Sequence, residues 1–288
     1  MPFKPSYEVP EERKPYLLKA NPQKSDGRVG CLMLHGFMGS PGSSRPMAEY
    51  LADEGVTMLC PLLPGHGHYP DKLYKVPRQA WLAEAEEAYL RLRQLCDQVF
   101  ITGHSMGTVM GAYLSTKYDD IRGMVMLTPL YELPDTRLRL MRWLRYVMPW
   151  FYPHKLKSMQ DLVRQRVLDF DPTIDFDDPA FQAKLPMMSR VPTSGLDEMV
   201  KMVEFGRDLW SRLTLPVLIF QGGDDPAVKP GTIQKIYDLL PSQDKHLETF
   251  PEAGHELMRP FEPVHTKVWQ LILRFFQERS ELGTVVAV

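Results

Sequence analysis

The sequence predicts an α/β protein with a mostly parallel sheet flanked by helices. Short apolar runs alternate with segments of helical periodicity over most of the 288 residues. Such alternation is typical of βαβ units, whose strands form a parallel sheet. It stops between residues 130 and 213, where we find no convincing strand, and then resumes. We therefore expect an α/β core, residues 28–129 and 214–280, with an inserted helical cap, residues 130–213, and an N-terminal extension, residues 1–27.

Composition and charge are those of an ordinary soluble globular protein, with 44% hydrophobic and 24% charged residues. The formal net charge of −2 argues against a nucleic-acid partner, because phosphate binding needs a concentrated basic surface. We find neither a signal-peptide core nor an apolar run of membrane-spanning length, so we expect a cytoplasmic location. Three cysteines without paired spacing predict buried thiols and no metal site.

The first half of the chain contains four predicted strands, each followed by a turn or a helix. These strands are residues 16–19, 29–34, 56–60 and 98–102. Helices are expected at 44–53, closed by Gly55, and at 77–95, with proline in the first turn. The continuous apolar run 29–34 is of the kind that a parallel sheet buries on both faces.

The predicted cap contains amphipathic helical patterns. Segment 137–147 interleaves arginines with leucine, methionine and tryptophan, and a second helix follows Ser194, which with Asp197 resembles a capping box. The arginine-rich segment could touch a membrane surface, but a solvated charged face is the commoner meaning of such a pattern, and we adopt that interpretation.

Five further elements, one before the cap and four after it, complete the core. They are a strand at 123–129 before the cap, a strand at 215–220, a helix at 232–239, a strand at 246–250 and, at the end, a helix at 263–277. The cap therefore follows a strand whose carboxyl end lies at the edge of the sheet where ligands bind in α/β proteins.

The strongest motif is Gly-His-Ser-Met-Gly at residues 103–107. It fits the G-x-S-x-G nucleophile elbow and lies between a predicted strand and a predicted helix, as that motif requires. Gly103 and Gly107 are explained by a sharp turn that leaves no room for a Cβ. The turn raises the Ser105 hydroxyl above the sheet edge and leaves the first helix amides unpaired, as half of an oxyanion site. We predict Ser105 as the nucleophile.

A serine nucleophile needs a base, and the base needs an acid that orients it. Among the eight histidines, His255 lies in a loop directly after the last predicted strand, and we predict it as the base. For the acid, Asp224 and Asp225 both follow the preceding strand. We choose Asp225, because a D-x-x-V pattern recurs at this acid, and assign Asp224 to the turn. The chain order serine, aspartate, histidine is that of hydrolases with this elbow.

Three other histidines lie near glycines of these motifs. His35 and His66 belong to tight turns, where we expect them to hydrogen-bond the backbone. His104 precedes the nucleophile and is expected to point elsewhere. None of the three is predicted as the base.

The sequence resembles the α/β-hydrolase superfamily, closest to its carboxylesterase and monoacylglycerol lipase branch. The resemblance covers most of the chain from Val29 to Gln277 and depends on His35-Gly36-Phe37, Pro64-Gly65-His66-Gly67, Gly103-His104-Ser105-Met106-Gly107, Gly223-Asp224-Asp225-Pro226-Ala227-Val228 and Gly254-His255. It implies an α/β-hydrolase fold, and it implies that the backbone N–H groups of Met106 and Phe37 are the two oxyanion donors. The cap matches no particular branch.

We expect a serine hydrolase that cleaves carboxylic esters through an acyl-enzyme and needs no cofactor. The substrate is expected to be a short- or medium-chain acyl ester or a monoacylglycerol, because the methionine-rich cap supplies an apolar wall. The residues predicted to line the acyl pocket are Met141, Met148, Met199 and Met202. Any one of them could equally fill the core of the cap.

Other functions fit the same residues. The triad could cleave an amide or a carbon–carbon bond or carry out perhydrolysis, and the fold could serve as a ligand receptor without catalysis. An epoxide hydrolase or dehalogenase with an aspartate nucleophile is disfavoured, because Ser105 occupies the elbow. Turnover of esters beside an amide analogue would separate these alternatives.

Overall fold

The computed structural model describes residues 2–133, 135–160, 163–164, 167–168, 173–228 and 231–282. A seven-stranded sheet with the order β1-β3-β2-β4-β5-β8-β9 lies at its centre. Strand β1 is antiparallel to β3, and the other neighbours are parallel. The strands are β1 (Tyr16–Leu18), β2 (Val29–Leu34), β3 (Thr57–Cys60), β4 (Gln98–His104), β5 (Ile121–Leu127), β8 (Val217–Gly222) and β9 (Lys245–Phe250). The predicted α/β fold with a mostly parallel sheet is confirmed.

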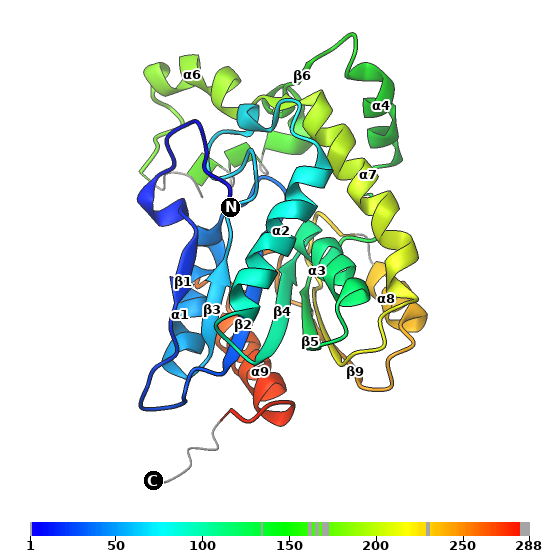
Figure 1. Ribbon diagram of the computed structural model, residues 1–288. Helices are drawn as coiled ribbons and strands as arrows, with labels where there is room; N and C mark the ends of the chain where they lie inside the picture. The colour runs from blue at the N-terminus through cyan, green and yellow to red at the C-terminus, as the bar shows by residue number, and fades with distance from the viewer. Residues whose placement is uncertain are drawn as a thin grey trace.

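Helices cover both faces of the sheet (Figure 1). Successive residues of β2 point to opposite faces, so that Cys31 and Met33 join one buried cluster while Leu32 and Leu34 join the other. Helices α1 (Arg45–Asp53) and α9 (His265–Glu278) contribute to the first cluster; α2 (Arg78–Arg93), α3 (Met106–Lys117) and α8 (Thr232–Leu239) contribute to the second. The apolar run at residues 29–34 was predicted to be a strand buried on both faces, and β2 is such a strand.

The chain forms the cap after β5 and returns to the sheet in β8. The cap contains η4 (Thr136–Leu140), α4 (Met141–Leu144), β6 (Trp150–Phe151), η5 (Pro153–Lys155), η6 (Lys157–Met159), α6 (Pro179–Ser189), β7 (Val191–Pro192) and α7 (Thr193–Trp210). The expectation of a cap without strands was wrong, because β6 and β7 form a short antiparallel ribbon. The aromatic residues Trp150 and Phe151 lie opposite Pro192 and Val191 and suit such pairing. A strand of two residues is too short to show a periodic pattern in the sequence.

Helix α7 attaches the cap to the core. Its residues Met202, Val203 and Trp210 are buried in the cluster that contains α3, and a Cβ on Gly206 would lie only 2.9 Å from a methyl of Val109. The glycine therefore allows the two helices to approach closely. The domain boundaries themselves stay a prediction.

The predicted capping box at Ser194 and Asp197 was wrong. Helix α7 begins at Thr193 and has no side-chain cap. The Ser194 hydroxyl instead accepts a hydrogen bond from the backbone N–H of Lys75 at 3.0 Å, and Asp197 forms ion pairs with Arg145 and Lys201. Partners distant in sequence thus occupy both side chains, and no local pattern could indicate them.

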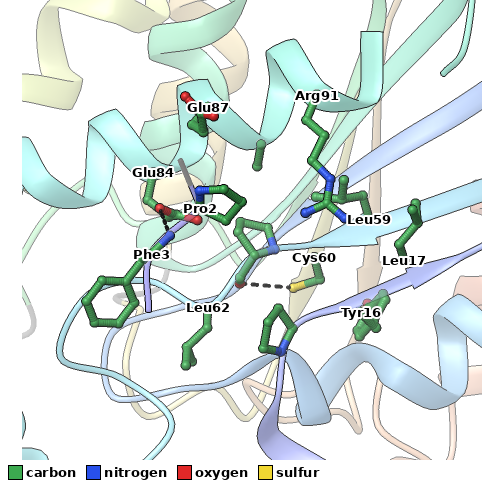
Figure 2. Close-up of a pocket in the computed structure, with 13 residues that line it drawn as sticks. Pro2, Phe3, Tyr16, Leu17, Leu59, Cys60, Leu62, Glu84, Glu87 and Arg91 are labelled. Carbon is green, nitrogen blue, oxygen red and sulfur yellow. Dashed lines mark hydrogen bonds between the residues drawn. The ribbon is translucent and has the colours of Figure 1, made fainter. Parts of the chain in front are cut away.

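The N-terminal extension packs on the core. Strand β1 pairs with β3, and the backbone N–H of Phe3 donates to Glu84 of α2 at 2.8 Å (Figure 2). Burial raises the pKa of Glu84. A cavity of about 110 Å³ lies between the extension, the strands β1 and β3 and α2. None of its lining residues is a predicted site residue, so we do not assign it to the candidate site.

The cysteines behave as small apolar residues, as predicted: Cys31, Cys60 and Cys96 are buried free thiols. Burial raises the pKa of Cys31 and of Cys60 to about 12. In the described part of the chain, no helix has the length and apolar character needed to cross a membrane.

Candidate active site

The nucleophile elbow has the geometry that the motif predicts. Ser105 lies between β4 and α3 with φ 52° and ψ −117°, a strained conformation for a residue other than glycine. A Cβ on Gly107 would lie 2.0 Å from the carbonyl oxygen of Leu34, and one on Gly103 would lie 2.6 Å from the amide nitrogen of Thr108. Both positions therefore require glycine, and Ser105 lies directly after β4, at the carboxyl edge of the sheet.

Asp225 and His255 are brought together from two neighbouring loops. Asp225 follows β8, His255 follows β9, and His255 Nδ1 lies 2.8 Å from Asp225 Oδ2. The other oxygen of Asp225 accepts hydrogen bonds from the amides of Ala227 and Val228, at 2.7 and 3.0 Å. Because these amides and the imidazole occupy both oxygens of a buried carboxylate, Asp225 is held in one orientation.

Asp224 has a different environment. Its side chain is exposed, and its backbone N–H donates to the carbonyl oxygen of Ala253 at 3.0 Å. It therefore helps to hold the loop that precedes His255, as expected for a residue of the turn. Of the two aspartates, Asp225 is the one in contact with His255.

The backbone of His255 is held by two side chains that sequence reasoning missed. Its carbonyl oxygen lies 3.0 Å from His104 Nε2 and accepts a hydrogen bond from the Thr128 hydroxyl at 3.1 Å. The rings of His104 and His255 are 4.8 Å apart, so the loop of His255 lies beside the elbow. Thr128 is buried and has φ 45°. Its only sequence signal was its place after β5, the strand next to the elbow strand.

The loop after β2 passes beside Ser105. A Cβ on Gly36 would lie 3.2 Å from the Cβ of Ser105, and the next residue is Phe37. The turn is closed by the N–H of Gly39, which donates to the carbonyl of Gly36 at 3.1 Å. Met106 is the first residue of α3, where helix amides have no partner within the helix. The two expected oxyanion donors thus belong to segments that meet at Ser105.

Two buried histidines beside this loop hydrogen-bond the backbone, as predicted for both. His35 Nε2 accepts a hydrogen bond from the N–H of Leu63 at 3.2 Å, so Nδ1 carries the proton toward the carbonyl of Gly36 at 3.0 Å. Burial lowers the pKa of His35 to about 4, so the ring is neutral at pH 7. His66 contacts the carbonyl of Pro64 at 3.1 Å, and its ring packs 5.1 Å from that of His35.

The four cap methionines do not lie in one environment. Met141 is buried in a small cluster of the cap that also packs against Phe37. Met199 and Met202 are buried in the cluster between α7 and the core, and Met148 is exposed. Their assignment to an acyl pocket stays a prediction, and Met141 is the one whose cluster packs against Phe37, an expected oxyanion donor.

Comparison with known proteins identifies the family. The family model described as serine aminopeptidase, S33, matches residues 25–263. The thermostable monoacylglycerol lipase of Bacillus sp. (strain H-257) is 29% identical over 245 residues, which cover 85% of this chain and 90% of the relative. The carboxylesterase of Bacillus subtilis (strain 168) is 22% identical over 270 residues, which cover 90% and 96%.

Solved structures share the fold. The crystal structure of the monoacylglycerol lipase of Paleococcus ferrophilus superposes with a TM-score of 0.67 at 20% identity, and the match covers 93% of this chain and 100% of that one. At this identity the likeness establishes the α/β-hydrolase fold. Together with the family model, it shows that the chain belongs to the S33 family of α/β-hydrolases.

Proposed function

We propose that this protein is a serine hydrolase that cleaves carboxylic esters with a triad of Ser105, His255 and Asp225. The observation that carries the proposal is the 2.8 Å contact between His255 Nδ1 and Asp225 Oδ2, made beside a strained nucleophile elbow. A carboxylate at Nδ1 keeps the proton on that nitrogen and leaves Nε2 free to accept the serine proton. This tautomer is what a general base for Ser105 requires.

The reaction passes through an acyl-enzyme. Ser105 Oγ attacks the ester carbonyl while His255 takes its proton, and the tetrahedral intermediate expels the alcohol as His255 returns the proton. Water then attacks the acyl group by the same route and releases the acid. The backbone N–H groups of Phe37 and Met106 stabilise the oxyanion in both halves, and one such donor contributes about 3 kcal/mol in a related hydrolase.

The surroundings of Phe37 favour an apolar acyl group. The cluster of Met141, Val191 and Leu196 packs against Phe37 and Met38, so an apolar surface of the cap borders the oxyanion loop. Relatives of this chain are named monoacylglycerol lipase and carboxylesterase. We therefore propose short- or medium-chain acyl esters or monoacylglycerols as substrates.

The test is a turnover screen. Nitrophenyl esters from acetate to palmitate, monoacylglycerols and a matched amide are assayed side by side. We expect ester cleavage to dominate. The family model is described as an aminopeptidase, so preferential amide cleavage would move the proposal to that alternative, and binding without any turnover would favour a receptor.

The nucleophile is tested separately. Ser105→Ala is expected to lower kcat by about 10⁶-fold, because members of a triad act as a unit. A fluorophosphonate should label Ser105 alone, as located by mass spectrometry. Residual activity within tenfold of the wild type, or a label elsewhere, would overturn the assignment.

A further inference from the structure

The loop that carries His255 closes on itself. It leaves β9 at Phe250 and enters α9 at His265. Its two arms meet where the backbone N–H of Gly254 donates to Glu262 Oε2 at 3.2 Å. Gly254 directly precedes His255 in the sequence. The residue before the proposed base is therefore held by a side chain from the segment just before α9.

Glu262 is buried, which is unusual for its residue type. It is 9% exposed, although glutamate is rarely buried in proteins unless it has a partner. Removing a carboxylate from water costs free energy that hydrogen bonds to its oxygens must offset. Its Oε2 accepts from Gly254, and a Cβ on Gly254 would lie 2.9 Å from its Oε1. Both oxygens thus lie against Gly254, and the contact needs a residue without a side chain there.

The backbone of Glu262 is itself fixed, so the carboxylate has a firm anchor. Its N–H donates to the carbonyl oxygen of Arg259 at 2.9 Å, and its carbonyl accepts from the backbone N–H of His265 at 3.2 Å. His265 Nδ1 also lies 2.7 Å from that carbonyl. Trp269 of α9 makes a second tie, since its Nε1–H donates to the carbonyl of Met258 at 2.9 Å. Helix α9 therefore holds the loop at two points.

We propose that Glu262 is a positioning residue for His255, an inference that rests on the proposed function. The Glu262 contact holds the chain on the N-terminal side of His255. On the other side, His104 and Thr128 contact the carbonyl oxygen of the same residue. With the backbone held on both sides, only the side-chain torsions of His255 remain free. The imidazole then stays in the orientation that its 2.8 Å contact with Asp225 needs.

Glu84 offers a matched control within the same chain. It is also buried, at 8% exposed, and it also accepts a backbone hydrogen bond from a distant residue, the N–H of Phe3 at 2.8 Å. It belongs to α2 and borders the cavity under the N-terminal extension. Loss of either glutamate should lower the stability of the fold, but only loss of Glu262 should slow the reaction.

The experiment compares Glu262→Met, Glu262→Gln and Glu84→Met by nitrophenyl ester kinetics and urea unfolding. Glu262→Met keeps the length of the side chain without an oxygen acceptor. Its kcat is expected to fall about tenfold to a hundredfold with KM nearly unchanged. Glu262→Gln keeps one acceptor oxygen and should recover most of the activity. Glu84→Met should keep the kcat of the wild type, even where its loss of stability equals that of Glu262→Met.

Gly254→Ala tests the same contact from the other side. The added Cβ displaces the Glu262 carboxylate, so kcat should fall to a similar extent. Combining Gly254→Ala with Glu262→Met should add little, because both changes remove one contact. A wild-type kcat in Glu262→Met would overturn the proposal. So would an equal fall in Glu84→Met, or a Glu262→Gln variant as slow as Glu262→Met.

A second readout does not depend on turnover. The proton on His255 Nδ1, hydrogen-bonded to Asp225, gives a downfield NMR resonance that Asp225→Asn should abolish. We expect this resonance to broaden in Glu262→Met and to stay sharp in Glu84→Met. An unchanged resonance in Glu262→Met would overturn the positioning role. If the wild type cleaves no ester, the proposed function fails, while a broadened resonance would still support the positioning of His255 by Glu262.

Discussion

The α/β core and the cap hold their polar groups in different ways. In the core, the polar groups of the candidate site meet backbone atoms of the loops that follow the strands: Asp225 accepts from two amides, and the carbonyl of His255 contacts His104 and Thr128. In the cap, charged side chains meet one another. Asp197 and Glu198 of α7 both bind Arg145, and both bind Lys201.

This difference suggests different roles for the two regions, with the core holding the candidate catalytic groups and the cap forming surfaces that a substrate would contact. A backbone group has no side-chain torsions of its own, so a side chain hydrogen-bonded to it has little freedom. Ion pairs between long side chains allow more movement, although Arg78 of α2 also binds Glu198 and ties the network to the core. We infer that the core fixes the groups proposed to react, while the cap, attached through side chains, can vary its surfaces. The following changes test that conclusion.

The largest expected effect separates the two neighbouring aspartates of the core. Asp225→Asn should lower kcat by about 10⁴-fold, because an amide at Nδ1 favours the wrong tautomer of His255. Asp224→Asn should be mild, since the Asp224 contact to Ala253 uses its backbone. Steady-state kinetics on one nitrophenyl ester checks both variants. The reverse ranking would show that Asp224 orients the base.

The second effect concerns the pH dependence of the core. The pKa of His35 is lowered from 6.5 to about 4 by burial, so the unfolded chain takes up this proton at a higher pH than the folded one. The contribution of His35 is complete above about pH 6.5, and up to about 3 kcal/mol is lost as the pH falls toward 4. Burial also lowers the pKa of His66, which adds in the same direction.

Urea unfolding between pH 7 and 4.5 measures this loss. His35→Gln removes the titrating group and should give a flatter profile. His246→Gln, at an exposed position, is the control and should follow the wild type. A wild-type profile that is flat over this range would contradict the buried neutral state of His35.

A smaller effect is expected at Thr128, which we infer positions His255. Thr128→Val removes the hydroxyl donor and leaves the carbonyl of His255 with one fewer partner, so kcat should fall about tenfold to a hundredfold with KM nearly unchanged. Thr128→Ser retains the hydroxyl and should recover most of the activity. If the serine variant is as slow as the valine variant, the methyl group rather than the hydrogen bond is what matters.

The smallest effect tests the cap as a substrate wall. Each methylene that fits an apolar pocket adds up to about 0.8 kcal/mol, nearly fourfold in kcat/KM, so the chain-length profile should rise and then fall. Met141→Ala and Met141→Trp should shift the optimum in opposite directions. Met202→Ala, in the cluster that packs α7 on the core, should cost about 2–5 kcal/mol of stability without a shift. A flat profile in the wild type would make the cap a structural lid only.

The sequence by itself determined the sheet and the elbow. The apolar run of β2 and the glycines on either side of Ser105 are local signals, since they depend on burial of successive residues and on steric space within a few residues. The α/β class, the order of strands along the chain and the conformation of Ser105 followed from them. Asp225 and His255 were predicted to act together because both follow strands that end at the same edge, and the structure places their side chains 2.8 Å apart.

Tertiary structure decided the contacts between distant segments. Ser194 and Asp197 have the spacing of a capping box. In the fold, however, Ser194 accepts a hydrogen bond from Lys75 and Asp197 pairs with Arg145, because folding brings together partners that no local pattern encodes. The support of His255 by His104 and Thr128 arises in the same way. The cap methionines share one residue type yet occupy different environments, and only packing separated Met141, in the cluster against Phe37, from Met202, between α7 and the core.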